Sequence, residues 1–272
     1  MRFAIPAMGT RFEVVLFAGA GGTGHAQLRA AGEAVIDEIA YWHARLNRFA
    51  PDSLVSHIVR RRGEPIRLDR ETYDLFADAD TVWRASEGAF DITVTGRAHL
   101  IKLDGSARTI TVDGDDISID LGGIAKGHAL DCARARLEDA GVTAGLIHGG
   151  TSSVVAVGRP SASSRWRVAL GPDAGDDVVT LADAALSLSD PAGQREVSGS
   201  DHIVDPRARF GRPGAARPTE RVAVIGPSAR LADAWSTALA VLGQAPDTLP
   251  IGYDARFLPG LVGAHPDAAA AI

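Results

Sequence analysis

An acidic residue, a glycine pair and a lysine lie close together in residues 120–127, and this segment constrains the fold more than any other. It reads Asp120-Leu121-Gly122-Gly123-Ile124-Ala125-Lys126-Gly127, followed by Asp131. Residues 117–121 alternate like a strand and residues 125–140 have helical character, which predicts a strand-to-helix turn at the glycines. The free N–H groups of the helix start and the charge of Lys126 suit a phosphate. A plain tight connection would use the same glycines.

Composition narrows the class of protein. The 272 residues are 46% hydrophobic and carry a net charge of −6, with acids and bases interspersed. A chain of this kind buries a substantial core and lacks the basic stripe of a nucleic-acid or membrane-surface protein. No stretch reaches the roughly 18 apolar residues of a membrane helix, and the single Cys132 excludes an internal disulfide. Residues 1–6 lack a signal-peptide pattern, so we expect a cytoplasmic protein without nucleic-acid or membrane partners.

Short β-rich segments in meanders, with helices at several joins, predict an α+β fold rather than a doubly wound sheet. Helical spacing marks residues 28–46, 71–86, 125–140 and 228–242, and β-rich segments mark residues 11–17, 146–148, 154–157, 166–170, 178–181, 186–188 and 221–225. Asp-Gly turns at 104–105 and 113–114 predict short strands around residues 100, 109 and 117. No linker divides the chain, so we expect one domain over residues 1–272, which could consist of two closely packed subdomains.

A glycine-rich segment near the start of the chain matches the fingerprint of dinucleotide-binding folds. Residues 19–24 read Gly-Ala-Gly-Gly-Thr-Gly and lie between a predicted strand and a predicted helix. A dinucleotide-binding unit continues after its helix into a second apolar strand that ends in a ribose-binding acid. Here the helix runs into residues 48–52, Arg-Phe-Ala-Pro-Asp, instead. We therefore interpret the segment as a flexible turn and keep an NAD-dependent oxidoreductase only as an outside alternative.

Two oxygen-bearing side chains lie one turn apart in the predicted helix 228–242. Asp233 and Thr237 project from the same helix face. A carboxylate and a hydroxyl, completed by a main-chain carbonyl, waters and phosphate oxygens, suit Mg²⁺, which prefers hard oxygen ligands. Asp233 near a helix start would also favour the helix dipole without any metal.

Four further motifs are weak when taken separately. They are Met8-Gly9-Thr10, Gly88-Ala89-Phe90-Asp91-Ile92-Thr93-Val94, Gly149-Gly150 and His202-Ile203-Val204-Asp205-Pro206. A phenylalanine such as Phe90 is more often core than a stacking platform, and a histidine such as His202 is more often an ordinary loop residue. Taken in order with residues 120–131 and with residues 232–243, these motifs resemble the FAD:protein FMN transferase (ApbE) family.

The resemblance covers residues 8–243 and implies an α+β fold of the ApbE type. It implies FAD as donor, a divalent cation that is usually Mg²⁺, and transfer of the FMN half to a Thr or Ser hydroxyl of an acceptor protein with release of AMP. By position, the implied FAD contacts are Met8, Phe49, Ala89, Phe90, Asp91, Asp120, Lys126, His202 and Ile203. The implied metal ligands are the carbonyl of Gly123 and the side chains of Asp233 and Thr237.

The chemistry of this reaction assigns catalytic roles to three residues. Attack on a diphosphate phosphorus builds negative charge, which Mg²⁺, Lys126 and the helix N-terminus would stabilise. His202 or Asp205 could accept the proton of the acceptor hydroxyl. We favour His202, because an imidazole titrates near neutral pH.

Several departures from the family pattern keep two alternatives open. Val59 replaces a polar residue expected near the flavin, residues 188–190 read Leu-Ser-Asp in place of Thr-Ser-Gly, and His148 stands where an asparagine is common. The stretch between Asp91 and Asp120 is also shorter than usual. One alternative is a FAD pyrophosphatase, which uses water as the nucleophile at the same site. The other is a non-catalytic FAD-binding protein.

Overall fold

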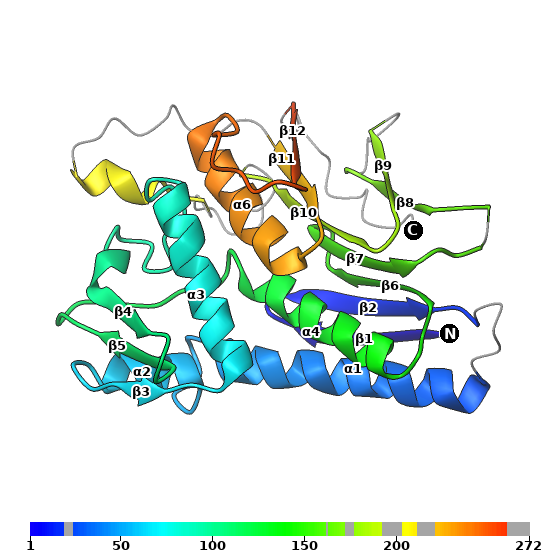
Figure 1. Cartoon of the computed structure of the whole chain (residues 1–272), viewed down its shortest axis with the longest axis horizontal. Coiled ribbons are helices and arrows are strands. Elements are labelled where there is room, and N and C mark those ends of the chain that lie inside the picture. Colours follow the sequence, from blue (N-terminus) through cyan, green and yellow to red (C-terminus); the bar gives the residue numbers. More distant parts are fainter. Residues whose placement is uncertain (19–23, 162, 172–176, 192–202, 211–220, 260–272) are drawn as a thin grey trace.

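The computed structural model describes residues 1–18, 24–161, 163–171, 177–191, 203–210 and 221–259 (Figure 1). The helices are α1 (His25–Leu46), α2 (Leu54–Arg60), α3 (Arg70–Ala85), α4 (Ala125–Asp139) and α6 (Ala229–Leu242), with short 3₁₀ turns at Ala98–Leu100 and Pro206–Phe210. The strands are β1 (Arg2–Ala7), β2 (Thr10–Leu16), β3 (Ile66–Arg67), β4 (Ile101–Asp104), β5 (Thr109–Val112), β6 (Ala144–Gly149), β7 (Ser153–Gly158), β8 (Trp166–Ala169), β9 (Val178–Leu181), β10 (Ala184–Ser189), β11 (Arg221–Gly226) and β12 (Asp254–Leu258). The predicted α+β class is confirmed.

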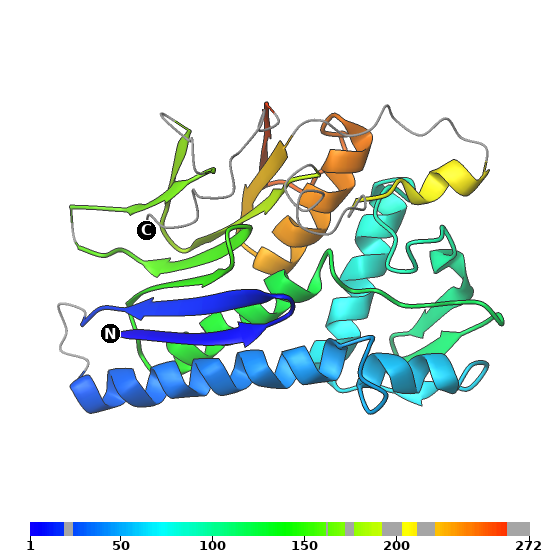
Figure 2. The ribbon, with the colours of Figure 1, turned by 180° about the vertical axis from the view of Figure 1, so that it is seen from behind.

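A seven-stranded sheet in the order β1-β2-β6-β7-β10-β11-β12 forms the larger half of the molecule, and its neighbouring strands pair antiparallel. Helices α1, α4 and α6 lie against one face, as the two opposite views show (Figures 1 and 2). Strand β7 is buried on both sides: Val155 packs toward α1 and α4, whereas Val154 packs with Trp166 of β8 on the other face. This alternation follows from the two-residue period of a strand.

The smaller half consists of a three-stranded sheet, β3-β5-β4, together with α2 and α3. Its core joins Phe76 of α3 and Ile110 of β5 to Trp42 of α1 and Trp235 of α6. Helix α1 is 22 residues long and contributes to both cores, because Val35 and Ile39 pack under the large sheet. The site described below lies where α4 and α6 meet between these two halves (Figure 1).

Two expectations about secondary structure need correction or qualification. Residues 117–121 form no strand; they bury Ile117, Ile119 and Leu121 in the core of the smaller half. The alternation of apolar and polar residues in this segment reflects that burial. The Asp113-Gly114 turn leads from β5 into this segment and not into another strand. Residues 19–23 of the glycine-rich segment lie outside the described residues, but α1 is followed by α2 and not by the strand that a dinucleotide-binding unit requires.

Among the residues that the structure describes, no helix is long and apolar enough to cross a membrane.

A candidate active site at the crossing of α4 and α6

Helices α4 and α6 are in close contact near their N-termini. A Cβ atom added to Gly127 would lie 2.1 Å from the carbonyl oxygen of Ala229, so only glycine allows this approach. Each helix supplies a carboxylate to the start of the other. Asp131 of α4 accepts hydrogen bonds from Ser228 Oγ (2.6 Å) and from the amides of Ala229 (2.9 Å) and Arg230 (3.0 Å). Asp233 of α6 accepts one from the amide of Gly127 (3.0 Å), which satisfies a free donor of the α4 start.

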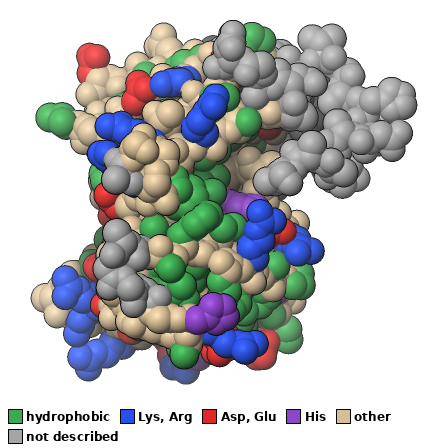
Figure 3. Space-filling view, turned by 90° about the vertical axis from the view of Figure 1, so that its right-hand side faces the viewer, with side chains coloured by type: hydrophobic (Ala, Val, Ile, Leu, Met, Phe, Trp, Pro, Cys, Tyr) green, Lys and Arg blue, Asp and Glu red, His purple; other side chains and the backbone are tan. Residues whose placement is uncertain are grey.

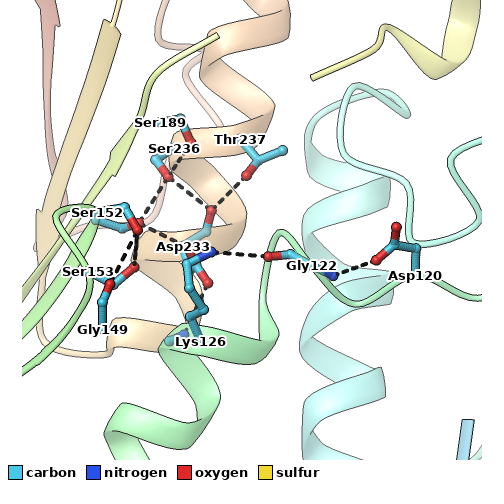
Figure 4. A network of polar contacts seen from close by, with 12 residues as sticks. Asp120, Gly122, Lys126, Gly149, Ser152, Ser153, Ser189, Asp233, Ser236 and Thr237 are labelled. Carbon is cyan, nitrogen blue, oxygen red and sulfur yellow. Dashed lines mark hydrogen bonds and ion pairs between the residues drawn. The ribbon is translucent and has the colours of Figure 1, made fainter. Parts of the chain in front are cut away.

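Asp233 is 4% exposed, and its carboxylate is the centre of the site. One oxygen, Oδ2, accepts the Gly127 bond, and the other, Oδ1, accepts a hydrogen bond from Ser187 Oγ of β10 (3.0 Å). The ammonium of Lys126 lies 3.9 Å from Oδ1 (Figure 4). A buried carboxylate needs such donors and a nearby positive charge, since its desolvation is otherwise very costly.

The glycine turn that precedes α4 lies beside this carboxylate. Gly122 donates its amide to Asp120 Oδ1 (2.9 Å) and accepts a long hydrogen bond from Lys126 Nζ (3.3 Å) (Figure 4). A Cβ atom at Gly123 would meet both Thr237 Oγ1 and Phe90 Cε2 at 3.1 Å. The structure therefore brings the three residues expected to bind metal, Gly123, Asp233 and Thr237, to one place.

A network of buried serine hydroxyls extends from Asp233 across the sheet, and sequence reasoning missed it. Ser187 Oγ lies within 3.5 Å of the hydroxyls of Ser153 and Ser236, and Ser236 contacts Ser189 Oγ (2.9 Å). Ser152 continues the network toward the carbonyl of Gly149 (Figure 4). Ser187 and Ser189 are two residues apart on β10, and that period-2 spacing of hydroxyls in an otherwise apolar strand was the available signal.

The residues expected to contact the flavin are placed in different ways. Ala89 and Phe90 are buried, and Phe90 contacts the glycine turn. Asp91 is also buried, and it accepts bonds from the amide (2.6 Å) and hydroxyl (2.5 Å) of Thr93 and from the amide of Ala98 (3.2 Å). Asp91 thus organises its own loop.

Met8 and Phe49 lie on segments close to α1. Met8 has a left-handed φ of 50° and donates its amide to His43 Nδ1 (3.1 Å). Phe49 is 81% exposed, and the guanidinium of Arg48 stacks 4.5 Å from its ring centre. The same arginine lies 3.4 Å from Asp120 Oδ2, so it links Phe49 to the glycine turn.

The histidine motif is described only in part. His202 lies outside the described residues, and Ile203 packs half-buried against the core of the smaller half. Asp205 binds Arg207 through both carboxylate oxygens at 2.9 Å. Among the described residues, no group of three or more His, Cys, Asp or Glu side chains could hold a metal ion; the expected set has a single carboxylate.

Two cavities are lined by residues outside the α4–α6 crossing. One, of about 480 Å³, is lined by Trp83, Arg84, Glu87, Gly88, Asp91, Gly96 and Arg207. The other, of about 610 Å³, lies at the start of the chain and is lined by residues that include Met1, Phe3, Leu16 and Leu28. Figure 3 shows the right-hand end of the molecule, where hydrophobic side chains gather in the middle and charged ones surround them.

A neutral histidine of α4 packs beside the crossing of α4 and α6. His128 of α4 is buried, its ring lies 4.2 Å from that of Trp42, and Arg230 Nη1 lies 3.3 Å from its Nδ1. Burial, reinforced by the charge of Arg230, lowers the pKa of His128 to about 3. Burial also raises the pKa of the neighbouring Cys132 thiol to about 12, so both groups are uncharged packing elements at neutral pH.

The fold and the site define an α+β protein in which a glycine turn, a lysine and a buried carboxylate meet at one helix start. A sequence profile described as the ApbE family matches residues 8–249, and the chain belongs to this family. The resemblance expected from the ordered motifs is confirmed.

Relatives named FAD:protein FMN transferase occur in Rhodobacter capsulatus (31% identical over 193 residues, 66% of this chain) and Chlamydia pneumoniae (27% over 228 residues, 71% of this chain). The matched regions span 31% of the length of the first relative and 70% of the second.

Solved structures share the fold. The ApbE protein of Thermotoga maritima gives a TM-score of 0.73 at 24% identity, with 89% of this chain and 87% of that one covered. The flavin transferase ApbE of Vibrio cholerae gives 0.73 at 20% identity, with 95% and 96% covered.

Proposed function

We propose that the chain is a Mg²⁺-dependent FAD:protein FMN transferase that moves FMN from FAD to a Thr or Ser hydroxyl of an acceptor protein and releases AMP. The observation that carries this proposal is the meeting of Asp233, Thr237 and Lys126 at the Gly122–Gly123 turn, in a family whose named relatives are transferases of this type. The cytoplasmic location stays a prediction, which cell fractionation would test.

The residues present fit a divalent cation. Asp233 offers a carboxylate, Gly123 a carbonyl, and Thr237 a hydroxyl that donates to the Asp233 carbonyl (3.1 Å) and so keeps its own lone pairs available. These three would hold Mg²⁺, leaving further positions for water and phosphate oxygens. When bound, the cation would neutralise charge that develops on the diphosphate.

The chain's own groups would bind and orient the donor around that point. The Lys126 side chain is 21% exposed, and its ammonium would contact the diphosphate, to which the α4 start would add its dipole. We assign to Phe90, Met8 and Phe49 apolar contacts with the flavin side. Val59 packs against the core of the smaller half, so it offers no polar contact in place of the expected one.

His202 is our proposed base for the acceptor hydroxyl. Asp205, the second candidate, already accepts a bidentate pair from Arg207, which favours the carboxylate as a structural partner of that arginine. The proton would pass from the hydroxyl to the imidazole as the hydroxyl oxygen attacks the phosphorus next to the riboflavin part and AMP departs.

One assay separates this function from its alternatives. The purified protein is incubated with FAD and Mg²⁺, AMP and FMN are followed by chromatography, and covalent flavin is sought on candidate acceptor proteins. Release of AMP that requires an acceptor supports transfer. AMP with free FMN and no acceptor indicates a pyrophosphatase, and no AMP at all indicates a binding protein.

Asp233→Ala tests the role of the central carboxylate. We expect turnover to fall at least about a hundredfold, because the proposed cation loses its charged ligand. Asp247→Ala, at an exposed position, is the matched control and should retain activity. Circular dichroism of both variants checks folding, and full activity in Asp233→Ala would refute the cation assignment.

A further inference from the structure

Lys126 lies between a main-chain carbonyl of the glycine turn and Asp233, one of the groups expected around a bound cation. Its Nζ lies 3.3 Å from the carbonyl oxygen of Gly122 and 3.9 Å from Asp233 Oδ1. A main-chain carbonyl of the glycine turn and the carboxylate of Asp233 are also the kinds of ligand that the proposed Mg²⁺ site uses. The ammonium therefore lies where it can stand in for a cation.

The burial of Asp233 explains why a positive charge is needed there. The side chain of Asp233 is 5% exposed, and Lys126 is its single ion-pair partner among the described residues. The Ser187 hydroxyl and the Gly127 amide donate hydrogen bonds but carry no net charge. Because 3.9 Å exceeds hydrogen-bond distance, the ammonium balances the carboxylate without being locked to it.

The identity of the side chain supports this role. The chain has two lysines among its 28 lysine and arginine residues, Lys126 and Lys102. Lys102 has a 70% exposed side chain and pairs with Asp113 on the surface (2.6 Å). A compact ammonium on a flexible stem can leave a carboxylate for another anion, whereas a planar guanidinium tends to hold it in a fixed bidentate pair.

We infer that Lys126 is a tethered counter-ion of Asp233, which a divalent cation displaces when it binds. This inference rests on the cation site of the proposed function and adds a regulatory property to it. Before metal binds, Lys126 pairs with the buried carboxylate and offsets its charge, and it therefore competes with the metal for this position. Once displaced, the ammonium turns to the diphosphate, so the site is completed when metal and nucleotide arrive together.

Binding of Mn²⁺ in the absence of FAD tests the competition. Free Mn²⁺ is titrated by electron paramagnetic resonance against wild type, Lys126→Met, Lys102→Met and Asp233→Asn. We expect Lys126→Met to bind Mn²⁺ about tenfold more tightly than wild type, because removing a charge close to the site removes its repulsion. Lys102→Met should match wild type, and Asp233→Asn should bind much more weakly than either.

A second readout uses the wild-type protein and does not depend on the folding of a variant. Lysine labelled with ¹³C at the ε position gives two signals, and Lys102 serves as the internal control. Added Mg²⁺ should shift the Lys126 signal and leave the Lys102 signal in place.

The outcomes separate the inference from the function on which it rests. If wild type binds Mn²⁺ through Asp233 but Lys126→Met binds no more tightly, or the Lys126 signal stays unchanged as Mg²⁺ binds, the counter-ion role is overturned and the cation site stands. If Mn²⁺ binds neither protein, with or without FAD, the cation site and the inference fail together.

Discussion

Asp233 shows how much a single side chain depends on neighbours far away in the sequence. Its two oxygens are held by the Gly127 amide and the Ser187 hydroxyl, which come from α4 and β10. A carboxylate held on both oxygens cannot rotate freely, so its direction is set before any ligand binds. At a charged site, fixing the direction of a ligand-binding group in advance contributes more to binding and catalysis than one more contact to the ligand.

Ser187→Ala should therefore weaken the site without unfolding the protein. We expect kcat/KM to fall about tenfold, since a hydrogen bond to a buried charge is lost, and Mn²⁺ affinity to fall with it. Ser187→Thr should restore most of the activity. Ser153→Ala removes another buried hydroxyl of the same network, 3.5 Å from that of Ser187, and is the control. Equal losses in Ser187→Ala and Ser153→Ala would contradict a specific positioning role.

His128 should make stability depend on pH. Its pKa is about 3 in the folded protein and 6.5 in the reference state, so between these values the unfolded chain binds a proton that the folded chain does not. The free energy of unfolding should then fall as pH drops below 6.5, with a limiting slope of about 1.4 kcal/mol per pH unit from this group.

Urea unfolding between pH 7 and pH 5 measures that slope. His128→Gln should flatten it, whereas His25→Gln, at an exposed position of α1, should leave it unchanged. A slope that is the same in wild type and His128→Gln would show that the histidine is not the responsible group.

At the scale of the elements, the crossing of α4 and α6 decides where the site forms. Reciprocal carboxylates join the two helix starts, and Gly127 allows the backbones to touch. The same contact places Asp233, which lies one turn before Thr237 in α6, beside the glycine turn that begins α4. A change in the distance between these helices would therefore move several ligands at once.

Gly127→Ala tests the importance of this approach. Its Cβ would lie 2.1 Å from the Ala229 carbonyl oxygen, and we expect the free energy of unfolding to fall by about 3 kcal/mol or more through overpacking. Gly105→Ala adds a Cβ whose nearest contact is an ordinary 3.4 Å to Tyr73 Oη, so its effect should stay within about 0.5 kcal/mol. Similar stabilities of the two variants in urea would contradict the close-contact argument.

Most elements were predictable from local patterns, and the errors have a physical cause. The longer helices α1, α3, α4 and α6 were placed within about three residues, as for α6, which Ser228 caps and Gly243 ends. The short helix α2, which Ser53 caps, was not predicted, because seven residues give too little periodicity. Residues 117–121 alternate because every second side chain enters the core. Periodicity reports burial, and only a neighbouring strand turns an extended segment into part of a sheet.

At the scale of the whole molecule, the two cores share their helices. Trp42 of α1 packs into the smaller half while Val35 packs under the large sheet, and in α4 Ala129 and Leu130 belong to different cores. We therefore propose that residues 1–272 unfold as one unit, even though the fold has two visible halves.

Thermal and urea unfolding should then show a single transition. Tryptophan fluorescence reports Trp42 and Trp235 in the core of the smaller half and Trp166 in the cluster on the face of the large sheet away from the helices. This fluorescence should change together with far-UV circular dichroism. Two separated transitions, or fluorescence and dichroism midpoints that differ, would instead indicate two subdomains with independent stability.

The amino-acid sequence by itself determined the α+β class, the positions of the longer helices and the residues that could bind a phosphate and a cation, because periodicity, caps and glycine turns are local properties. It could not show that Gly127 binds Asp233, that Ser187 orients the same carboxylate or that Lys126 balances its charge. Ser187 and Asp233 are 46 residues apart, and Gly127 and Asp233 are 106 apart. Contacts over such separations form only when packing brings the elements together, so the tertiary structure alone decided them.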